Sequence, residues 1–125
     1  MTKKIKVAIV EDDIAISQMY RLKFEAEGYE VQTADNGLLG LELTEIFKPD
    51  IILLDLMMPE MTGDRMLAEL RKKSWGKDIT VIILTNMGEE EAPRSLRELN
   101  VHSFIVKAEM TPRQVAERVK LALSS

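Results

Sequence analysis

The 125-residue chain contains no cysteine and one histidine, His102. Without thiols it can form neither a disulfide framework nor a thiolate metal site, and the absence of cysteine favours a reducing compartment. One imidazole cannot build a histidine-rich metal site, and no motif spacing marks His102 as a ligand, so we interpret it as a structural or surface residue. These absences argue against soft-metal chemistry and favour a cytoplasmic location.

Long apolar runs and an excess of basic residues are also missing. No run reaches membrane-spanning length, and the start, Met1–Lys4, leads into an apolar segment without the core of a signal peptide. We therefore expect a protein that is neither membrane-bound nor exported. The 17 lysines and arginines are outnumbered by 21 acids, which gives a net charge of -4 and argues against a nucleic-acid surface. We interpret the basic cluster at 71–73 as the complement of a helix dipole.

The most informative stretch is an aliphatic run at 51–54, which ends in Asp55 and is followed by a turn at Pro59. An apolar run without polar alternation is typical of a central strand covered on both faces, as in parallel sheets flanked by helices. Ligands of such sheets bind beyond the carboxyl ends of the strands. Asp55 taken alone is also compatible with a simple turn residue, so the other strand ends must decide.

Three further aliphatic segments end in polar residues as well. They are 5–10, which ends in Glu11-Asp12-Asp13, 79–84, which ends in Thr85-Asn86, and 103–106, which ends in Lys107. Turn propensity alone would rarely supply an acid pair, an acid, a hydroxyl and a lysine at four strand ends. We therefore expect these side chains to converge in space.

Between the strands, apolar residues recur at helical spacing. Helices are predicted at 14–27, at 38–47, at 63–73, within 89–100, and from Pro112 onward. Gly28 ends the first helix, and Thr111 with Gln114 forms a capping box that begins the last one. The segment 89–100 has few apolar residues, and Pro93 is tolerable there only in the first turn of a helix. The helix at 38–47 is apolar on more than one face, so we expect one face to be exposed.

These elements predict one α/β domain over residues 1–125. Five strands alternate with five helices, without a repeat, which indicates a doubly wound parallel sheet with helices on both faces. The segment 30–34 alternates polar and apolar residues, as a half-exposed edge strand does. With this strand at the edge, the flavodoxin-like order 2-1-3-4-5 is the one that fits.

The converging residues indicate phosphoryl chemistry. Asp12, Asp13 and Asp55 at one mouth would carry about three negative charges, which require cations nearby. Lys107 is one cation, and Mg²⁺ is the metal that prefers carboxylates, water and phosphate. An aspartate without a neighbouring acid to protonate a leaving group suits in-line attack on phosphorus. The pattern predicts an aspartyl phosphate on Asp55, stabilised by Mg²⁺, Lys107 and the Thr85 hydroxyl.

On these residues the chain resembles, from end to end, the receiver domain of two-component response regulators. The matching positions are the acid pair Asp12-Asp13, the phosphoacceptor Asp55 within Leu54–Pro59, Gly63, the hydroxyl Thr85, the aromatic switch position Phe104, and Lys107. The resemblance implies that the Met57 carbonyl completes a magnesium site. It also implies that Thr85 moves inward after phosphorylation and opens space for Phe104 to rotate.

The resemblance further implies the partners. We expect the phosphoryl group to come from the phosphohistidine of a histidine kinase or phosphotransfer protein, with small phosphodonors as an alternative. The signal should reach an unidentified protein through the face of the fourth helix, fifth strand and fifth helix, without contact to nucleic acid or membrane. We expect a monomer or weak dimer that catalyses only its own phosphorylation and dephosphorylation. Both a stand-alone, chemotaxis-type regulator and a receiver of a longer transcription factor fit these residues.

Some positions depart from the family pattern. Ala108 follows Lys107, where the family usually has a cis proline, and a cis bond without proline would cost about 3 kcal/mol. Asn86 stands where a small residue is usual, which narrows the entry for large donors. Met57 and Met87 occupy the two positions that flank the attacking-water path, and a thioether cannot orient water, so slow hydrolysis is expected.

Other classes of protein fit less well. A phosphatase of the haloacid dehalogenase type would need an Asp-x-Asp motif after the first strand and a cap domain, and Glu11-Asp12-Asp13-Ile14 does not match that motif. A flavodoxin-like binding module would need a phosphate-cradling loop where these acids stand. A receiver that has lost phosphorylation and acts only as an interaction module stays open, although every phosphorylation residue is present.

Overall fold

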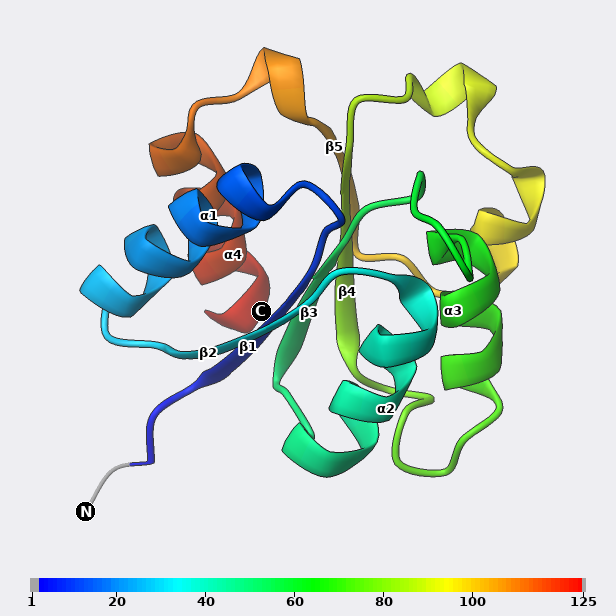
Figure 1. Ribbon diagram of the computed structural model, residues 1–125, viewed down its shortest axis with the longest axis horizontal. Helices are drawn as coiled ribbons and strands as arrows, with labels where there is room; N and C mark the ends of the chain where they lie inside the picture. Colours follow the sequence, from blue (N-terminus) through cyan, green and yellow to red (C-terminus); the bar gives the residue numbers. More distant parts are fainter. Residues whose placement is uncertain (1–2, 125) are drawn as a thin grey trace.

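Five parallel strands form one sheet in the centre of the molecule (Figure 1). The computed structural model describes residues 3–124. The strands are β1 (Lys6–Val10), β2 (Glu30–Ala34), β3 (Ile51–Leu54), β4 (Thr80–Thr85) and β5 (Ser103–Val106), in the order β2-β1-β3-β4-β5. The predicted flavodoxin-like fold is confirmed, with β2 at one edge of the sheet.

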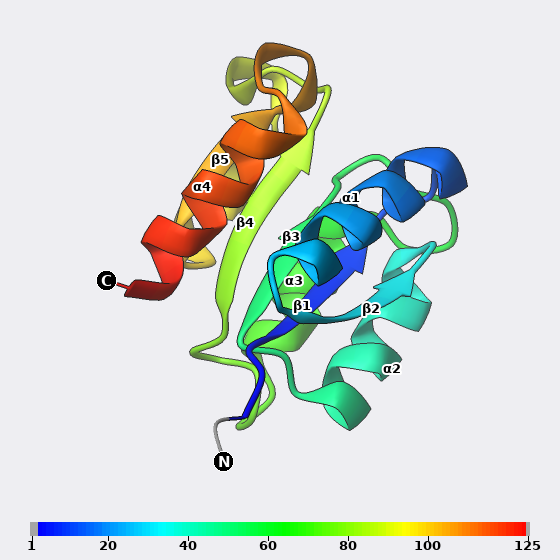
Figure 2. The same ribbon diagram turned by 90° about the vertical axis from the view of Figure 1, so that its left-hand side faces the viewer.

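Helices cover both faces of the sheet (Figures 1 and 2). One face carries α1 (Ile14–Ala26) and α4 (Pro112–Ser124), and the other carries α2 (Gly37–Phe47) and α3 (Gly63–Arg71). Successive strand residues point to opposite faces, so Val7 and Ile9 join the core under α1 and α4, while Ala8 and Val10 join the core under α2 and α3. Within residues 3–124, no helix has both the length and the apolarity needed to cross a bilayer.

The apolar run that the sequence marks as central is the most buried strand. Each residue of β3 is at most 1% exposed, because β1 and β4 flank it and helices cover both of its faces. In the parallel register Val10 pairs with Leu54, and Leu54 pairs with Ile83. The carboxyl ends of β1, β3 and β4 therefore meet at one end of the sheet.

The helix boundaries follow from local capping. The N–H of Thr111 donates to Gln114 Oε1 at 2.8 Å, and the N–H of Gln114 donates to Thr111 Oγ1 at 3.2 Å, so the predicted capping box is confirmed. Gly28, with φ of 96°, follows the end of α1 in the left-handed region that favours glycine. Asn36 caps α2 by accepting the Leu39 N–H at 2.8 Å.

The prediction of an α-helix within 89–100 was wrong. This stretch forms two short 3-10 helices, η1 (Glu89–Glu91) and η2 (Arg94–Glu98), so residues 3–124 contain four α-helices. A third 3-10 helix, η3 (Lys107–Glu109), follows β5. Pro93 explains the break, because it lacks an N–H and pushes the preceding residue out of the helical region. Ala92 accordingly has an extended backbone with ψ of 151°. Among residues 88–100, Leu96 is the one that is buried.

Candidate functional site

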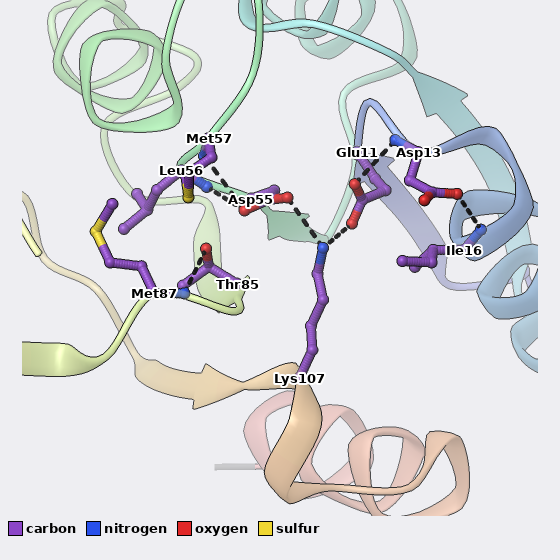
Figure 3. Close-up of polar contacts among 9 residues, drawn as sticks. All are labelled: Glu11, Asp13, Ile16, Asp55, Leu56, Met57, Thr85, Met87 and Lys107. Atoms are coloured by element: carbon purple, nitrogen blue, oxygen red, sulfur yellow. Dashed lines mark hydrogen bonds and ion pairs between the residues drawn. The ribbon is translucent and has the colours of Figure 1, made fainter.

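Four polar residues meet where the strands end (Figure 3). Glu11 follows β1, Asp55 follows β3, Thr85 ends β4 and Lys107 follows β5. The Lys107 ammonium donates to Asp55 Oδ2 at 2.9 Å and also to Glu11 Oε1. This convergence is the one that the strand ends predict, and it joins residues 96 positions apart in the sequence.

The Asp55 carboxylate is held on several sides. Its Oδ1 accepts the N–H of Leu56 at 2.7 Å and the N–H of Met57 at 3.3 Å, while Oδ2 accepts from Lys107. The residue is 6% exposed. Gly63 allows this arrangement, because a Cβ at that position would collide with the carbonyl oxygen of Asp55. The carboxylate is therefore preorganised, since backbone and lysine fix its orientation.

Lys107 is a buried cation between two carboxylates. Its side chain is 9% exposed, and that of Glu11 is 5% exposed. Burial alone would lower the pKa of Lys107, but the hydrogen bonds to Glu11 and Asp55 outweigh it and hold the pKa above its ordinary value. Burial raises the pKa of Glu11, and the hydrogen bond from Lys107 opposes that rise. At neutral pH the lysine is therefore protonated and neutralises part of the acidic charge.

Three carboxylates form the acidic group of the site. Oxygens of Glu11, Asp12 and Asp55 all lie within 4.8 Å of one another. They are hard oxygen donors, and Asp12 is exposed, so the group fits Mg²⁺, which keeps several waters when bound to protein. The chemistry of these donors does not suit a softer metal.

Asp13 lies outside this group, which differs from the expected pair Asp12-Asp13. Its Oδ1 accepts the N–H of Ile16 at 3.1 Å and so caps α1, while its own N–H donates to Glu11 Oε2 at 3.0 Å. Glu11 takes the expected place of Asp13 in the site. Aspartate is a strong N-cap residue, and the helix beginning at Ile14 was predicted, so capping preference was the signal that could have separated the two acids.

Comparison with known proteins agrees with this geometry. The family model described as "Response regulator receiver domain" matches residues 7–120. The chain belongs to this family. It is 41% identical over 119 residues to the transcriptional regulatory protein CpxR homolog of Haemophilus influenzae, across 94% of this chain and 50% of that protein. It is 32% identical over 120 residues to the probable transcriptional regulator ycf27 of Cyanophora paradoxa, across 96% of this chain and 48% of that protein.

Solved structures also resemble this receiver domain. The chemotaxis protein CheY4 of Vibrio cholerae superposes with a TM-score of 0.88 and 28% identity, covering 96% of this chain and 99% of that one. A CheY-like receiver domain protein of Methanospirillum hungatei gives a TM-score of 0.89 and 27% identity, covering 98% and 95%. By contrast, the receiver chain spans about half the length of the curated relatives it matches.

The two expected switch residues of the receiver domain lie on neighbouring strands. Thr85 is fully buried, and its Oγ1 accepts the N–H of Met87 at 3.3 Å. Phe104 on β5 pairs in register with Ile83 on β4 and is partly buried against the core under α2 and α3. The hydroxyl and the ring therefore share one strand pair, which is the connection that a coupled movement requires.

A hollow lies beside the acidic group of the receiver. It measures about 620 Å³ and is lined by Asp12, Met57, Met87 and Pro59, among others. Met57 is 59% exposed, and Met87 is partly buried.

All peptide bonds of the described residues 3–124 are trans, so Ala108 follows Lys107 through a trans bond. This agrees with the cost of a cis bond at a residue other than proline.

Proposed function

We propose that this receiver domain accepts a phosphoryl group on Asp55. The donor is the phosphohistidine of a histidine kinase or phosphotransfer protein in the cytoplasm. The observation that carries the proposal is the Asp55 carboxylate, 6% exposed, hydrogen-bonded to Lys107 and flanked by two further acids suited to Mg²⁺. The receiver is a signalling domain rather than a metabolic enzyme.

In the proposed reaction, one carboxylate oxygen of Asp55 forms a P–O bond as the P–N bond of the donor breaks. Glu11, Asp12, Asp55 and the Met57 carbonyl would hold Mg²⁺, and this ion would neutralise charge on the phosphoryl oxygens. The two backbone N–H groups on Asp55 Oδ1 fix the plane of the nucleophile. That orientation favours an in-line approach to phosphorus.

Lys107 is the second cation that the proposed phosphoryl transfer uses. In the resting state its ammonium divides its hydrogen bonds between Glu11 and Asp55. When Asp55 is phosphorylated, the ammonium can turn from these carboxylates to a phosphoryl oxygen. The Thr85 hydroxyl, held by a 3.3 Å contact to the Met87 N–H, is available to donate to another phosphoryl oxygen.

The signal leaves through the output face, which we define as residues 89–100 with β5 and α4. Movement of Thr85 toward the phosphoryl group opens space for Phe104 on the paired strand β5. Phenylalanine carries no polar atom, so its inward state leaves no hydrogen-bond group unsatisfied. Residues 89–98 are the movable part, because Leu96 alone among these residues is buried. The recipient is a downstream protein.

Mass spectrometry of the intact protein after incubation with acetyl phosphate and Mg²⁺ tests the proposal. The wild type should gain one phosphoryl group, and Asp55→Asn should gain none because its amide is not a nucleophile of comparable strength. Asp13→Asn is a matched control that should still be modified, since Asp13 caps α1 outside the acidic group. A wild type that stays unmodified under both acetyl phosphate and a phosphorylated histidine phosphotransfer protein would refute the proposal and favour a pure interaction module.

A further inference from the structure

The residues of helix α2 that are buried are Gly37, Gly40, Thr44 and Phe47, whereas several of its large apolar residues face solvent. A Cβ at Gly40 would lie 2.8 Å from Val10 Cγ1 and 2.9 Å from Met66 Sδ, so the helix packs too closely for a larger inward residue. Leu39 and Ile46 are left 46% and 84% exposed. The core under α2 therefore does not use these side chains, although each exposes apolar area at a cost of about 25 cal/mol per Å².

The outward residues border a groove at the open edge of the sheet. Leu39 and Leu43 of α2 form one wall, and Ile14 and Gln18 of α1 form the other. Thr33 and Ala34 at the end of β2 line the groove between them, and its volume is about 410 Å³. We call this hollow the β2 groove. Figure 2 shows β2 at the edge between the two helices, where no further strand of the described chain covers it.

The apolar side chains follow helical spacing along this groove. Leu39 and Leu43 lie about one helical turn apart on α2, and Ile14 on the opposite wall is 67% exposed. A groove with apolar walls on two helices is the shape that receives an amphipathic helix, whose anchors recur at the same spacing. The spacing of these walls therefore matches a helical occupant.

The charged residues that line the groove are both acidic. They are Glu11 and Asp35, and Glu42 and Glu45 are exposed on α2, which contains no basic residue. Arg21 of α1 is paired with Glu25 at 3.4 Å. This acidic rim repels nucleic acid, anionic lipid and a second copy of the same rim, and it complements lysine or arginine.

We propose that the β2 groove docks a basic amphipathic helix of a partner protein. The apolar face of that helix would cover Ile14, Leu39 and Leu43, and its cationic flank would face Glu42 and Asp35. This site is distinct from the output face, because β2 and β5 are opposite edges of the sheet.

The test uses two synthetic helical peptides with the same leucine stripe, one with lysine and one with glutamate at all other positions. Each is titrated into the isotope-labelled chain with Mg²⁺ saturating, so that the acidic site is occupied. The lysine peptide should shift the amides of Ile14, Ala34 and Leu39 saturably. Leu39→Gln should weaken its binding about ten-fold, as expected for loss of one apolar anchor. Glu42→Lys should weaken it as well, through charge repulsion.

Leu121→Gln is the matched control, because Leu121 is 65% exposed on α4, away from the groove. It should bind the lysine peptide as the wild type does. Ile14→Gln serves as a second groove variant, because Ile14 lines the groove and is 67% exposed. Urea unfolding verifies that each variant folds. Equal binding of the two peptides, shifts confined to the output face, or unchanged affinity in both groove variants would overturn the proposal. So would self-association of the chain alone that Leu39→Gln abolishes, since the occupant would then be a second copy.

Discussion

The acidic site and the segment 88–100 both follow strands of the same sheet, yet they are held very differently. Glu11, Asp55 and Thr85 are at most 6% exposed and adjoin strands buried on both faces. In the segment, Leu96 is the one buried residue, and the backbone hydrogen bonds include isolated 3-10 contacts such as that from the Leu96 N–H to the Pro93 carbonyl at 3.2 Å. Because the site is preorganised and the segment is loosely packed, a chemical change at the site can cause movement of the segment.

One side chain limits how far that looseness extends. The Arg71 guanidinium donates to the carbonyls of Leu99 at 2.8 Å and Asn100 at 2.9 Å, and also to Ile79 at 2.8 Å. Further contacts reach the carbonyls of Gly76 and Lys77. The C-terminal end of the segment is therefore tied to α3 and to the start of β4, which leaves residues 88–98 as the part that can move.

Truncating one leucine in the core and one in the segment 88–100 should give the largest difference in unfolding free energy. Leu53→Ala removes a side chain that is 1% exposed in β3, and it should cost about 3 kcal/mol of unfolding free energy. Leu96→Ala, at 7% exposure in a segment that can collapse around the change, should cost about 1 kcal/mol. Urea unfolding of both variants measures this. Equal losses would show that the segment is packed as firmly as the core.

Removing the Arg71 hydrogen bonds to Leu99 and Asn100 should extend the loosely packed part of the segment to residues 99–102. Arg71→Met leaves several carbonyls without their donor, and we expect a loss of about 2 kcal/mol together with faster amide exchange at 99–102. Arg71→Lys should recover only part of this, because an ammonium cannot reach the same carbonyls as a planar guanidinium. Hydrogen exchange read by mass spectrometry is the measurement, and Arg65→Met, exposed on the same helix, is the control. Unchanged protection of 99–102 would mean that Arg71 does not anchor the segment.

Neutralising the acids one at a time tests which of them bind Mg²⁺. Asp12→Asn should weaken Mg²⁺ binding at least ten-fold, about 1.4 kcal/mol, because it removes a charged ligand from the group. Asp13→Asn should change affinity by less than about two-fold, since asparagine also caps a helix. Calorimetric titration distinguishes them. If Asp13→Asn lost as much affinity as Asp12→Asn, the expected pair Asp12-Asp13 would be restored.

Sequence patterns predicted the sheet because they record burial directly. The apolar run at 51–54 identified the central strand, and the polar alternation at 30–34 identified the edge. The helix within 89–100 was mispredicted because the consequence of Pro93 depends on tertiary contacts, and this segment has few. The apolar pattern at 38–47 predicted an exposed apolar face on this helix. Spacing alone could not show that Leu39 and Ile46 are exposed, since the close approach of Gly40 to Val10 is a property of the packed structure.

The site was predictable as a set of strand ends, but not in its individual contacts. Parallel strands bring Asp55, Thr85 and Lys107 to one end of the sheet whatever the details of the loops. The choice between Glu11 and Asp13 depends on which acid faces the sheet end and which one caps α1. The observed pair Glu11-Asp12 is shifted by one residue from the expected pair Asp12-Asp13. Composition does not distinguish between such neighbouring acids.

The smallest expected effect concerns the lifetime of the proposed aspartyl phosphate. Met57 and Met87 line the hollow beside Asp12, at the two positions that flank the attacking water in this family. A thioether fills volume and accepts hydrogen bonds only weakly, so neither residue can orient water toward phosphorus. Met57→Asn or Met87→Glu should therefore speed phosphate release by about ten-fold, about 1.4 kcal/mol of barrier. Release is followed after donor removal with Mg²⁺ saturating, and a wild type that decays as fast as both variants would contradict the prediction.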